Sequence, residues 1–274
     1  MTIKTLIEDT DCFHEYEKEH GLSFYIETSK HKILFDMGTS SLFLENAEKM
    51  GVDIKKVDIA IISHGHYDHG GGLSAFFNVN SKAKVYIHEK AFVGHFAKRG
   101  NGKMEDIGLN AQLQEKDRFV FVGDALKIDE ELELFSHVCG QRCIALSNQV
   151  LFQKEGKDLV QDTFDHEQSL VIRENDKSVL IAGCAHKGIL NILDRFNERS
   201  KEKLDVVIGG FHLSNPSLGT SEASALIDEI AHSLIETDSF YYTCHCTGLE
   251  PYERLKEVMK EQIQYLTTGS VVEI

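Results

Sequence analysis

The sequence places four potential metal ligands directly after an apolar run. Residues Val57–Ser63 are almost continuously apolar, which is typical of a strand buried on both faces of a sheet. The run ends in three imidazoles and one carboxylate within six residues: His64, His66, Asp68 and His69. Such a group gains little from mutual contact and is costly to bury unless it binds a metal ion. The pattern therefore predicts a metal site at the end of this strand, and the alternative is a polar surface loop that is rich in His by chance.

The spacing of these ligands is suited to two ions. In extended chain, His64 and His66 lie on the same side and can converge on one ion. Asp68 and His69 lie on the turn that follows and point towards a second position. Glycines 70–72 allow the backbone to turn sharply into the next helix. We therefore expect a dinuclear centre.

The composition excludes several classes of protein. The chain has 274 residues with 44 Asp+Glu against 29 Lys+Arg, which is a formal net charge of −15. An acidic protein lacks the basic surface that attracts nucleic acids and anionic membranes, so we expect neither as a partner. With 42% hydrophobic and 27% charged residues, the composition is typical of a globular protein. This composition is also compatible with self-association into a homo-oligomer.

The sequence also favours a cytoplasmic location. The first residues contain no basic region followed by a long apolar run, and every apolar segment is far shorter than the ~20 residues that span a bilayer. The cysteines are Cys12, Cys139, Cys143, Cys184, Cys244 and Cys246. Six cysteines without a secretion signal favour reduced thiols over a disulfide framework.

The apolar pattern predicts strands and helices on both sides of an irregular middle. In the first third, strands are expected at Gly21–Thr28, Lys32–Asp36, Val57–Ser63 and Lys84–His88, with helices between Ser40 and Gly51 and from Leu73. In the last third, the expected strands are Gln168–Arg173, Ser178–Cys184, Val206–Gly209 and Phe240–Thr243, and the expected helices are Gly188–Asn197, Glu222–Leu234 and Tyr252–Lys260. The middle, about 91–165, has only short β-like pieces and is more typical of a lid or substrate loop than of a linker. We expect one domain over residues 1–274.

Three of the expected strands in the last third end in residue types that carry chemistry. These ends are Cys184-Ala185-His186, Gly210-Phe211-His212 and Cys244-His245-Cys246-Thr247-Gly248. Open α/β sheets place their sites at strand ends. The three ends are therefore candidate positions for further site residues.

The pattern His64-x-His66-x-Asp68-His69 resembles the fingerprint of the metallo-β-lactamase superfamily, and the likeness extends over most of the chain. One branch is resembled in particular, through Gly183-Cys184-Ala185-His186, Gly209-Gly210-Phe211-His212-Leu213 and His245-Cys246-Thr247-Gly248. This is the branch of 7,8-dihydropterin-6-methyl-4-(β-D-ribofuranosyl)aminobenzene-5'-phosphate synthase-like proteins. The resemblance implies an α+β fold, an αββα sandwich of two face-to-face sheets with helices outside and a dinuclear site at one edge.

The resemblance implies a role for each ligand. His64 and His66 would bind the first ion, and Asp68 and His69 the second. His245, after the strand Phe240–Thr243, matches the C-terminal His ligand of the superfamily.

Three further positions have alternative interpretations. Asp36 stands where the superfamily keeps an Asp that supports the metal loop from behind the ligands, and it would otherwise cap a helix. Cys184 stands where other members place a bridging Asp or a metal-binding Cys; a thiolate suits zinc, but a buried Cys can also simply pack. For the mid-chain His ligand we favour His186, with His166 as the alternative.

Asp68 and His212 are the candidate catalytic residues. His212 is not needed to complete either metal shell, so we expect it to contact the substrate or to protonate the leaving group, and the alternative is a buried structural His. Cys244 and Cys246 flank His245, and strand alternation would point both away from the face that His245 uses. We therefore expect these two cysteines to pack.

The expected activity is hydrolysis through a metal-bridged hydroxide. Two divalent ions lower the pKa of a shared water from ~16 towards 7 and offset negative charge on a carbonyl or phosphoryl oxygen. The metals are expected to be zinc, with Mn or Fe as alternatives, and no organic cofactor is expected. The branch resemblance implies a small anionic substrate, a phosphate ester that is pterin- or nucleotide-like. Candidate contacts for its anion are Lys98, Arg99, Lys103 and Arg142.

Two alternatives to a phosphodiesterase or phosphohydrolase remain. The same hydroxide could attack the carbonyl carbon of a lactone or thioester. A metal-binding or sensing protein with low turnover would have almost the same sequence. The diiron flavoproteins of the superfamily use a carboxylate where this chain has His66, which favours zinc-like chemistry over redox chemistry.

Overall fold

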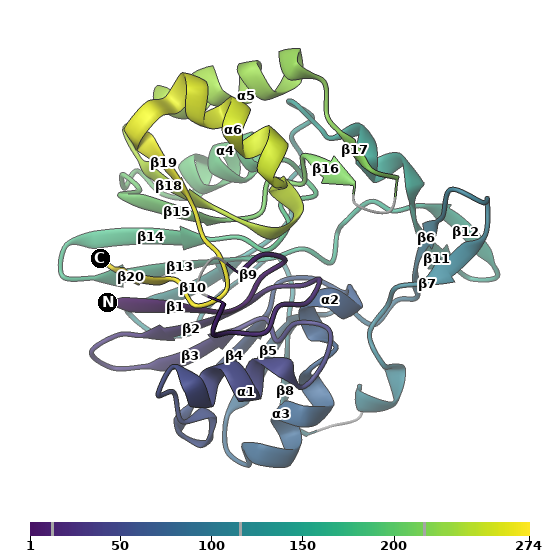
Figure 1. Cartoon of the computed structure of the whole chain (residues 1–274). Helices are drawn as coiled ribbons and strands as arrows, with labels where there is room; N and C mark the ends of the chain where they lie inside the picture. The colour runs from purple at the N-terminus through teal and green to yellow at the C-terminus, as the bar shows by residue number, and fades with distance from the viewer. Residues whose placement is uncertain (12–13, 115–116, 216–217) are drawn as a thin grey trace.

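The computed structural model describes residues 1–11, 14–114, 117–215 and 218–274, and Cys12 lies outside these ranges. Within them, two seven-stranded sheets lie face to face, with helices on both outer surfaces (Figure 1). The strand order is β20-β1-β2-β3-β4-β5-β8 in the first sheet and β19-β18-β15-β14-β13-β10-β9 in the second. This arrangement confirms the expected αββα sandwich.

Most elements lie close to where the sequence predicts them. The first sheet contains β1 (Thr2–Ile7), β2 (Ser23–Glu27), β3 (Lys32–Phe35), β4 (Ile59–Ile62), β5 (Lys84–His88), β8 (Phe119–Val122) and β20 (Val271–Glu273). The second contains β9 (Ala125–Lys127), β10 (Leu132–Phe135), β13 (Ser169–Glu174), β14 (Lys177–Ile181), β15 (Val206–Gly209), β18 (Phe240–Thr243) and β19 (Ile263–Tyr265). The helices outside the first sheet are α1 (Leu42–Lys49) and α3 (Leu73–Val79), and those outside the second are α4 (Ile189–Arg199), α5 (Ser224–Ile235) and α6 (Leu249–Met259) (Figure 1). The short helical turns are α2 (Tyr67–Gly70), η1 (Ile54–Lys56), η2 (Ala111–Leu113), η3 (Leu146–Val150), η4 (His245–Thr247) and η5 (Lys260–Gln262).

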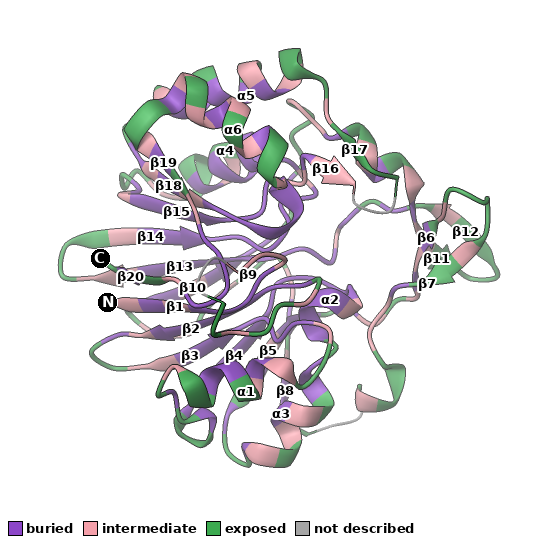
Figure 2. Cartoon of the chain, viewed as in Figure 1, coloured by how far each residue is buried: buried purple, intermediate pink, exposed green. Residues whose placement is uncertain are grey.

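Apolar layers hold the sandwich together. Ile61 of β4 belongs to the layer between the two sheets, together with Ile181 of β14. Its neighbour Ala60 points the other way and belongs to the layer beneath α1 and α3. A further layer lies beneath α4, α5 and α6. Because β4 is buried on both faces, its sequence is continuously apolar (Figure 2).

Parallel pairing brings the functional strand ends to one edge of the sandwich. β4 pairs in parallel with β3 and β5, and β15 pairs in parallel with β14 and β18. The carboxyl end of β4 leads to His64, that of β14 to Cys184 and that of β18 to His245. The carboxyl ends of parallel strands share one edge of a sheet, so the loops of both sheets can form one site there.

The middle of the chain contains more regular structure than its sequence pattern indicates. Four short strands form a separate antiparallel sheet that projects beyond the sandwich (Figure 1): β6 (His95–Lys98), β7 (Met104–Asp106), β11 (Leu151–Glu155) and β12 (Asp158–Gln161). A hairpin of β16 (Ser214–Asn215) and β17 (Thr220–Ser221) follows the second sheet's β15. The four strands of the projecting sheet are partly exposed and too short to show a strong apolar alternation in the sequence. None of the helices in the described ranges is long and apolar enough to cross a membrane.

Candidate metal centre

The loop after β4 folds into a buried turn. His66 precedes the first turn of α2, and Asp68 and His69 lie within it. His64 and His69 are fully buried, and the side chain of Asp68 is the most exposed of the group, with the residue only 9% exposed. His64 Nε2 lies 3.1 Å from His66 Nδ1. The four side chains therefore face the interior, unlike those of a surface loop that is rich in His by chance.

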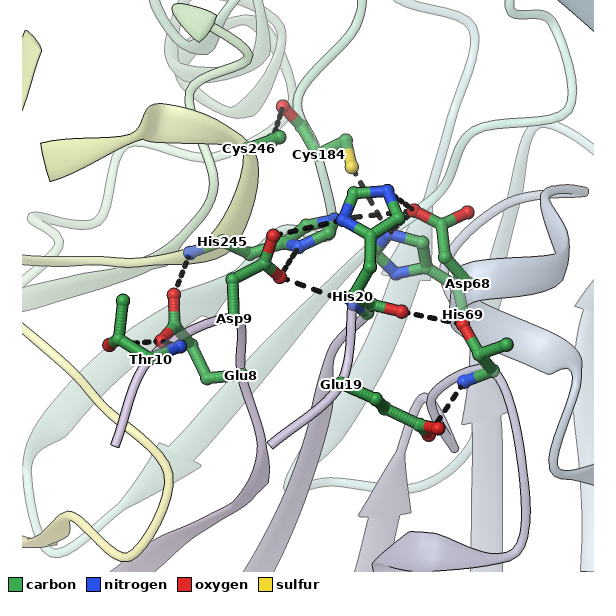
Figure 3. Close-up of polar contacts among 12 residues, drawn as sticks. Glu8, Asp9, Thr10, Glu19, His20, Asp68, His69, Cys184, His245 and Cys246 are labelled. Atoms are coloured by element: carbon green, nitrogen blue, oxygen red, sulfur yellow. Dashed lines mark hydrogen bonds and ion pairs between the residues drawn. The ribbon is translucent and has the colours of Figure 1, made fainter. Parts of the chain in front are cut away.

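The loops after β14 and β18 bring further donors to this turn. His69 Nε2 lies 3.1 Å from Cys184 Sγ, and Asp68 Oδ2 lies 3.3 Å from His245 Nε2 (Figure 3). Two groups of donor atoms each lie within 4.8 Å of one another: Asp68, His69, Cys184 and His245, and His64, Cys184 and His186. Cys184 belongs to both groups, which is the position of a ligand shared by two ions.

The donor set fits divalent metal ions. Imidazole, carboxylate and thiolate are the ligands that zinc takes in proteins. Across the described residues, His186 Nε2 is buried without a hydrogen-bond partner, as expected of a ring nitrogen reserved for an ion. Burial and neighbouring imidazoles lower the pKa of His64 and of His186 well below the usual value. Both rings are therefore neutral, which is the form that binds a metal.

Asp36 supports the metal loop from behind. Its carboxylate accepts hydrogen bonds from the backbone N and the Oγ of Ser63, both at 2.7 Å. Its Oδ2 also lies 2.7 Å from His69 Nδ1, which directs His69 Nε2 towards Cys184. The N-cap of helix α1 is Ser41, so Asp36 does not cap that helix.

Contacts from the middle of the chain place His186, rather than His166, beside His64 and Cys184. His186 Nδ1 lies 3.1 Å from Asn148 Oδ1, and the backbone N of His186 donates to Glu167 Oε1 at 2.7 Å. His166 Nε2 instead lies 3.3 Å from Asp162 Oδ2. The structure therefore brings His186, the residue favoured from the sequence, to the group of donors that contains His64 and Cys184.

Two carboxylates after β1 escaped the sequence analysis. Asp9 Oδ1 lies 2.6 Å from His245 Nδ1, and Asp9 Oδ2 lies 2.9 Å from His20 Nδ1 (Figure 3). Glu8 Oε1 accepts a hydrogen bond from the backbone N of His245 at 2.6 Å. Burial lowers the pKa of His245, but Asp9 and Asp68 outweigh burial and hold this pKa well above its usual value. In the sequence, the signal that could have found these two residues is a short β-like run, Thr2–Ile7, that is followed directly by Glu8 and Asp9.

His212 and Cys246 lie on the same side of the site as Cys184. One donor atom from each of the three lies within 4.8 Å of the others, and Cys246 Sγ lies 3.5 Å from the carbonyl oxygen of Cys184. The expectation that Cys246 points away from the site is wrong, because His245–Thr247 forms a 3-10 turn and strand alternation stops there. Cys244 packs in the layer between the sheets, as expected.

A cavity of about 350 Å³ opens beside these donors. The site residues that line it are His66, Asp68, Cys184, His186, His212, His245 and Cys246. Lys98, Arg99 and His20 also line it, and the sequence analysis had not singled out His20. Lys103 lies in the exposed β6–β7 turn, and Arg142 pairs with an acidic residue of α4. Of the four candidate anion contacts, the structure therefore places two at the cavity.

Residues 17–111 match the family described as the metallo-β-lactamase superfamily. This part of the chain is similar to a metallo-β-lactamase superfamily domain. The crystal structure of Tm1679, a metal-dependent hydrolase of the β-lactamase superfamily, is 29% identical to this chain, with a TM-score of 0.83 over 100% of this chain and 99% of that one. The superfamily match includes the metal loop after β4, and the structural match includes both sheets.

Two proteins of Methanocaldococcus jannaschii are similar to this metallo-β-lactamase-fold chain in sequence. An uncharacterised protein is 29% identical over 263 residues, which cover 93% of this chain and 94% of the relative. A 7,8-dihydropterin-6-methyl-4-(β-D-ribofuranosyl)-aminobenzene-5'-phosphate synthase is 26% identical over 288 aligned residues, which cover 99% of this chain and 96% of the relative. The second similarity confirms the resemblance to this branch.

Proposed function

We propose that this protein is a dinuclear metal-dependent hydrolase of small phosphate esters. The observation that carries the proposal is the position of Cys184, whose thiol belongs to two neighbouring groups of buried donors. In this assignment His64, His66 and His186 hold one ion, Asp68, His69 and His245 hold the other, and Cys184 lies between them. When bound, such a pair of ions supplies a water of lowered pKa and positive charge for an oxygen that becomes negative.

His212 is the residue that we assign to the leaving group. Its ring centroid lies 4.1 Å from that of His186, and it lines the cavity. Neither of its ring nitrogens has a partner at hydrogen-bond distance among the described residues, and the nearest ligand-type groups are the thiols of Cys184 and Cys246, within 4.8 Å. A ring with both nitrogens available at a cavity wall can donate a proton to a departing oxygen.

The substrate class rests on the cavity wall and on the relatives. Lys98 and Arg99 line a cavity in a chain whose formal net charge is −15, and Arg99 Nε also pairs with Glu105 Oε2 at 2.6 Å. Cationic side chains of this kind are suited to a phosphate group. The name of one relative contains a ribofuranosyl phosphate and a dihydropterin, and that of another describes a metal-dependent hydrolase. These observations support a small phosphate-bearing substrate.

The proposal is tested by a substrate screen with matched variants. Zinc-loaded wild type is assayed with aryl phosphodiester, phosphomonoester, lactone and thioester substrates, in parallel with His64→Ala and His232→Ala. His64→Ala removes a buried ligand, so we expect its rate on the phosphodiester to fall at least 100-fold. His232 is exposed on α5 and serves as the control, whose rate should match wild type.

The outcomes separate the hypotheses. Equal rates for wild type and His64→Ala would show that the activity comes from elsewhere. If only the lactone or the thioester is turned over, and this activity also depends on His64, that compound class rather than a phosphate ester is the substrate. Zinc binding without turnover of any substrate class would support a binding or sensing protein instead.

A further inference from the structure

His66 lacks an oxygen acceptor behind its ring, unlike His69, whose Nδ1 faces Asp36 Oδ2 at 2.7 Å. His66 Nδ1 lies 3.1 Å from His64 Nε2, so the proposed function, on which this inference rests, assigns Nδ1 of His66 to the ion. Among the described residues, His66 Nε2 is buried and has no hydrogen-bond partner. The second N–H of a metal-bound His normally donates to a carboxylate, a carbonyl or water, and an N–H that is buried without an acceptor costs free energy.

The imidazole of His95 lies beside His66 and has an unpartnered nitrogen of its own. The two ring centroids are 5.5 Å apart, and the ring planes meet edge to face at 76°. His95 Nε2 is buried and forms no hydrogen bond with any residue that the structure describes. His95 is fully buried and His66 is 4% exposed, so bulk water does not reach the space between them freely. Each ring is therefore the available partner of the other.

The contacts of His95 Nδ1 determine which nitrogen of this ring is the acceptor. His95 Nδ1 lies 2.9 Å from Asp162 Oδ2. A carboxylate only accepts hydrogen bonds, so a neutral His95 carries its proton on Nδ1 and a lone pair on Nε2. This lone pair can accept the Nε2–H of His66.

Asp162 is held in place by two further donors. Its Oδ1 accepts a hydrogen bond from the backbone N of Phe164 at 2.7 Å. The backbone N of Gly65 donates to His166 Nδ1 at 2.9 Å, which leaves the proton of a neutral His166 on Nε2, 3.3 Å from Asp162 Oδ2. Three N–H groups therefore point at this carboxylate, which favours its ionised form.

The backbone of the metal loop makes room for His95 at Gly65. A Cβ on Gly65 would lie 2.7 Å from His95 Nε2 and would overlap the carbonyl oxygen of Ala91. Gly65 lies between the two ligands His64 and His66 in the chain. The lone pair of His95 is therefore placed directly against the segment that carries His66.

We propose that His95 is the positioning residue of His66: its Nε2 accepts the Nε2–H of His66, which keeps Nδ1 of His66 free for the ion. Hydrogen bonds then run in one direction, from His66 through His95 to Asp162. An ion bound at Nδ1 fixes the His66 ring and its Nε2–H, so the contact between the two Nε2 atoms closes when the metal binds. A charge-bearing acceptor at the end of the chain makes His66 a stronger ligand.

Two substitutions of His95 separate this role from a purely structural one. The amide of His95→Gln reaches the position of Nε2 and can accept from His66, whereas the shorter amide of His95→Asn reaches only the position of Nδ1 and can donate to Asp162. We expect His95→Asn to weaken zinc binding about 10–100-fold and His95→Gln to keep most of the wild-type affinity. Competition with a colorimetric chelator measures the affinity of the full chain. His88→Asn changes a buried imidazole outside the donor groups and should bind zinc as wild type does.

Nitrogen-15 NMR of the histidines in zinc-loaded wild type identifies the nitrogen that carries the proton in each ring. We expect a proton on Nε2 of His66 and none on Nε2 of His95. A proton on Nε2 of His95 would overturn the proposal, as would weaker zinc binding by His95→Gln than by His95→Asn. The wild-type spectrum decides the question even if circular dichroism shows that a variant does not fold.

The outcomes also distinguish this role from the proposed function. If zinc binds with the expected proton positions but no phosphate ester is hydrolysed, the proposed function fails and the role of His95 stands. Hydrolysis of the phosphodiester by a protein with a proton on His95 Nε2 would overturn the role of His95 alone. Absence of zinc from His66 in wild type would overturn both.

Discussion

Three histidines of the centre are oriented in the same way by residues outside the ligand set. An oxygen acceptor faces Nδ1 in each ring, at 2.7 Å for Asp36 and His69, 2.6 Å for Asp9 and His245, and 3.1 Å for Asn148 and His186. Each contact determines which nitrogen carries the proton and which nitrogen faces the ion. At the scale of single residues, the acceptors are therefore as informative about the site as the ligands.

We expect Asp9→Asn to weaken zinc binding by about 10–100-fold, which is the usual effect of removing a carboxylate behind a metal-bound His. The substitution keeps the size of the side chain but removes the charge 2.6 Å from His245 Nδ1. Competition with a colorimetric chelator measures the affinity. Asp58→Asn, which alters a carboxylate beside His31 away from the centre, is the control. An unchanged affinity in Asp9→Asn would mean that Asp9 does not orient His245.

At the scale of elements, the two sheets approach each other closely where β14 and β4 end. A Cβ on Gly183, two residues after β14, would lie 2.6 Å from Ser63 Cβ and 3.3 Å from His64 Nδ1. Ser63 itself follows β4 and is held by Asp36. The two strand ends therefore lie so close together that no residue larger than glycine fits at position 183.

We expect Gly183→Ala to lower the free energy of unfolding by about 1–3 kcal/mol, as overpacking of a close contact does. The same substitution should also reduce zinc occupancy, because it pushes Ser63 towards His64. Urea unfolding measures the first effect, and metal analysis measures the second. Gly123→Ala is the matched control, since a Cβ there meets no atom within 4 Å. Equal stability of the two variants would contradict the close approach.

At the scale of the whole molecule, an acidic body encloses an interior rich in imidazoles. The formal net charge of −15 counts every His as neutral. Burial lowers the pKa of five interior histidines: His64, His66, His88, His166 and His186. Neighbouring carboxylates raise the pKa of His20 and His245 against the effect of burial. The stability of the metal-free protein must therefore depend on pH.

We expect metal-free protein to lose stability as the pH falls below about 6.5. The unfolded chain takes up protons on its histidines there, while the five buried rings with lowered pKa values resist protonation, and for His166 this continues to a pKa of about 4. Each such His costs up to about 1.4 kcal/mol per pH unit. His20 and His245 are protonated in both states below 6.5, so their stabilisation is complete there and is lost only as the pH rises through their raised pKa values.

Thermal unfolding of chelator-treated protein at pH 7.5, 6.5, 5.5 and 4.5 checks this expectation. The melting temperature should fall at each step below pH 6.5. A melting temperature that stays constant from pH 6.5 to 4.5 would show that the buried rings gain protons without unfolding.

Local sequence pattern was sufficient for elements whose apolar residues repeat regularly. β15 and β18 have the bounds that their sequence predicts, and β4 with its four ligands was found because one strand and one turn carry them all. The strands of the projecting sheet were missed because they are short and partly exposed. β1 was missed as well, and the two carboxylates that follow it were missed with it.

By itself, the sequence located the candidate metal loop, because ligand-type side chains within one turn converge through local backbone geometry alone. Only the tertiary structure decided which distant residues complete the site. Asp9 meets His245 across 236 positions, and His95 meets Asp162 across 67. Contacts of this range depend on how the two sheets and the projecting sheet are packed, and no periodic pattern in the chain records them. The selection of His186 also belongs to that level, because its contacts with Asn148 and Glu167 come from distant segments.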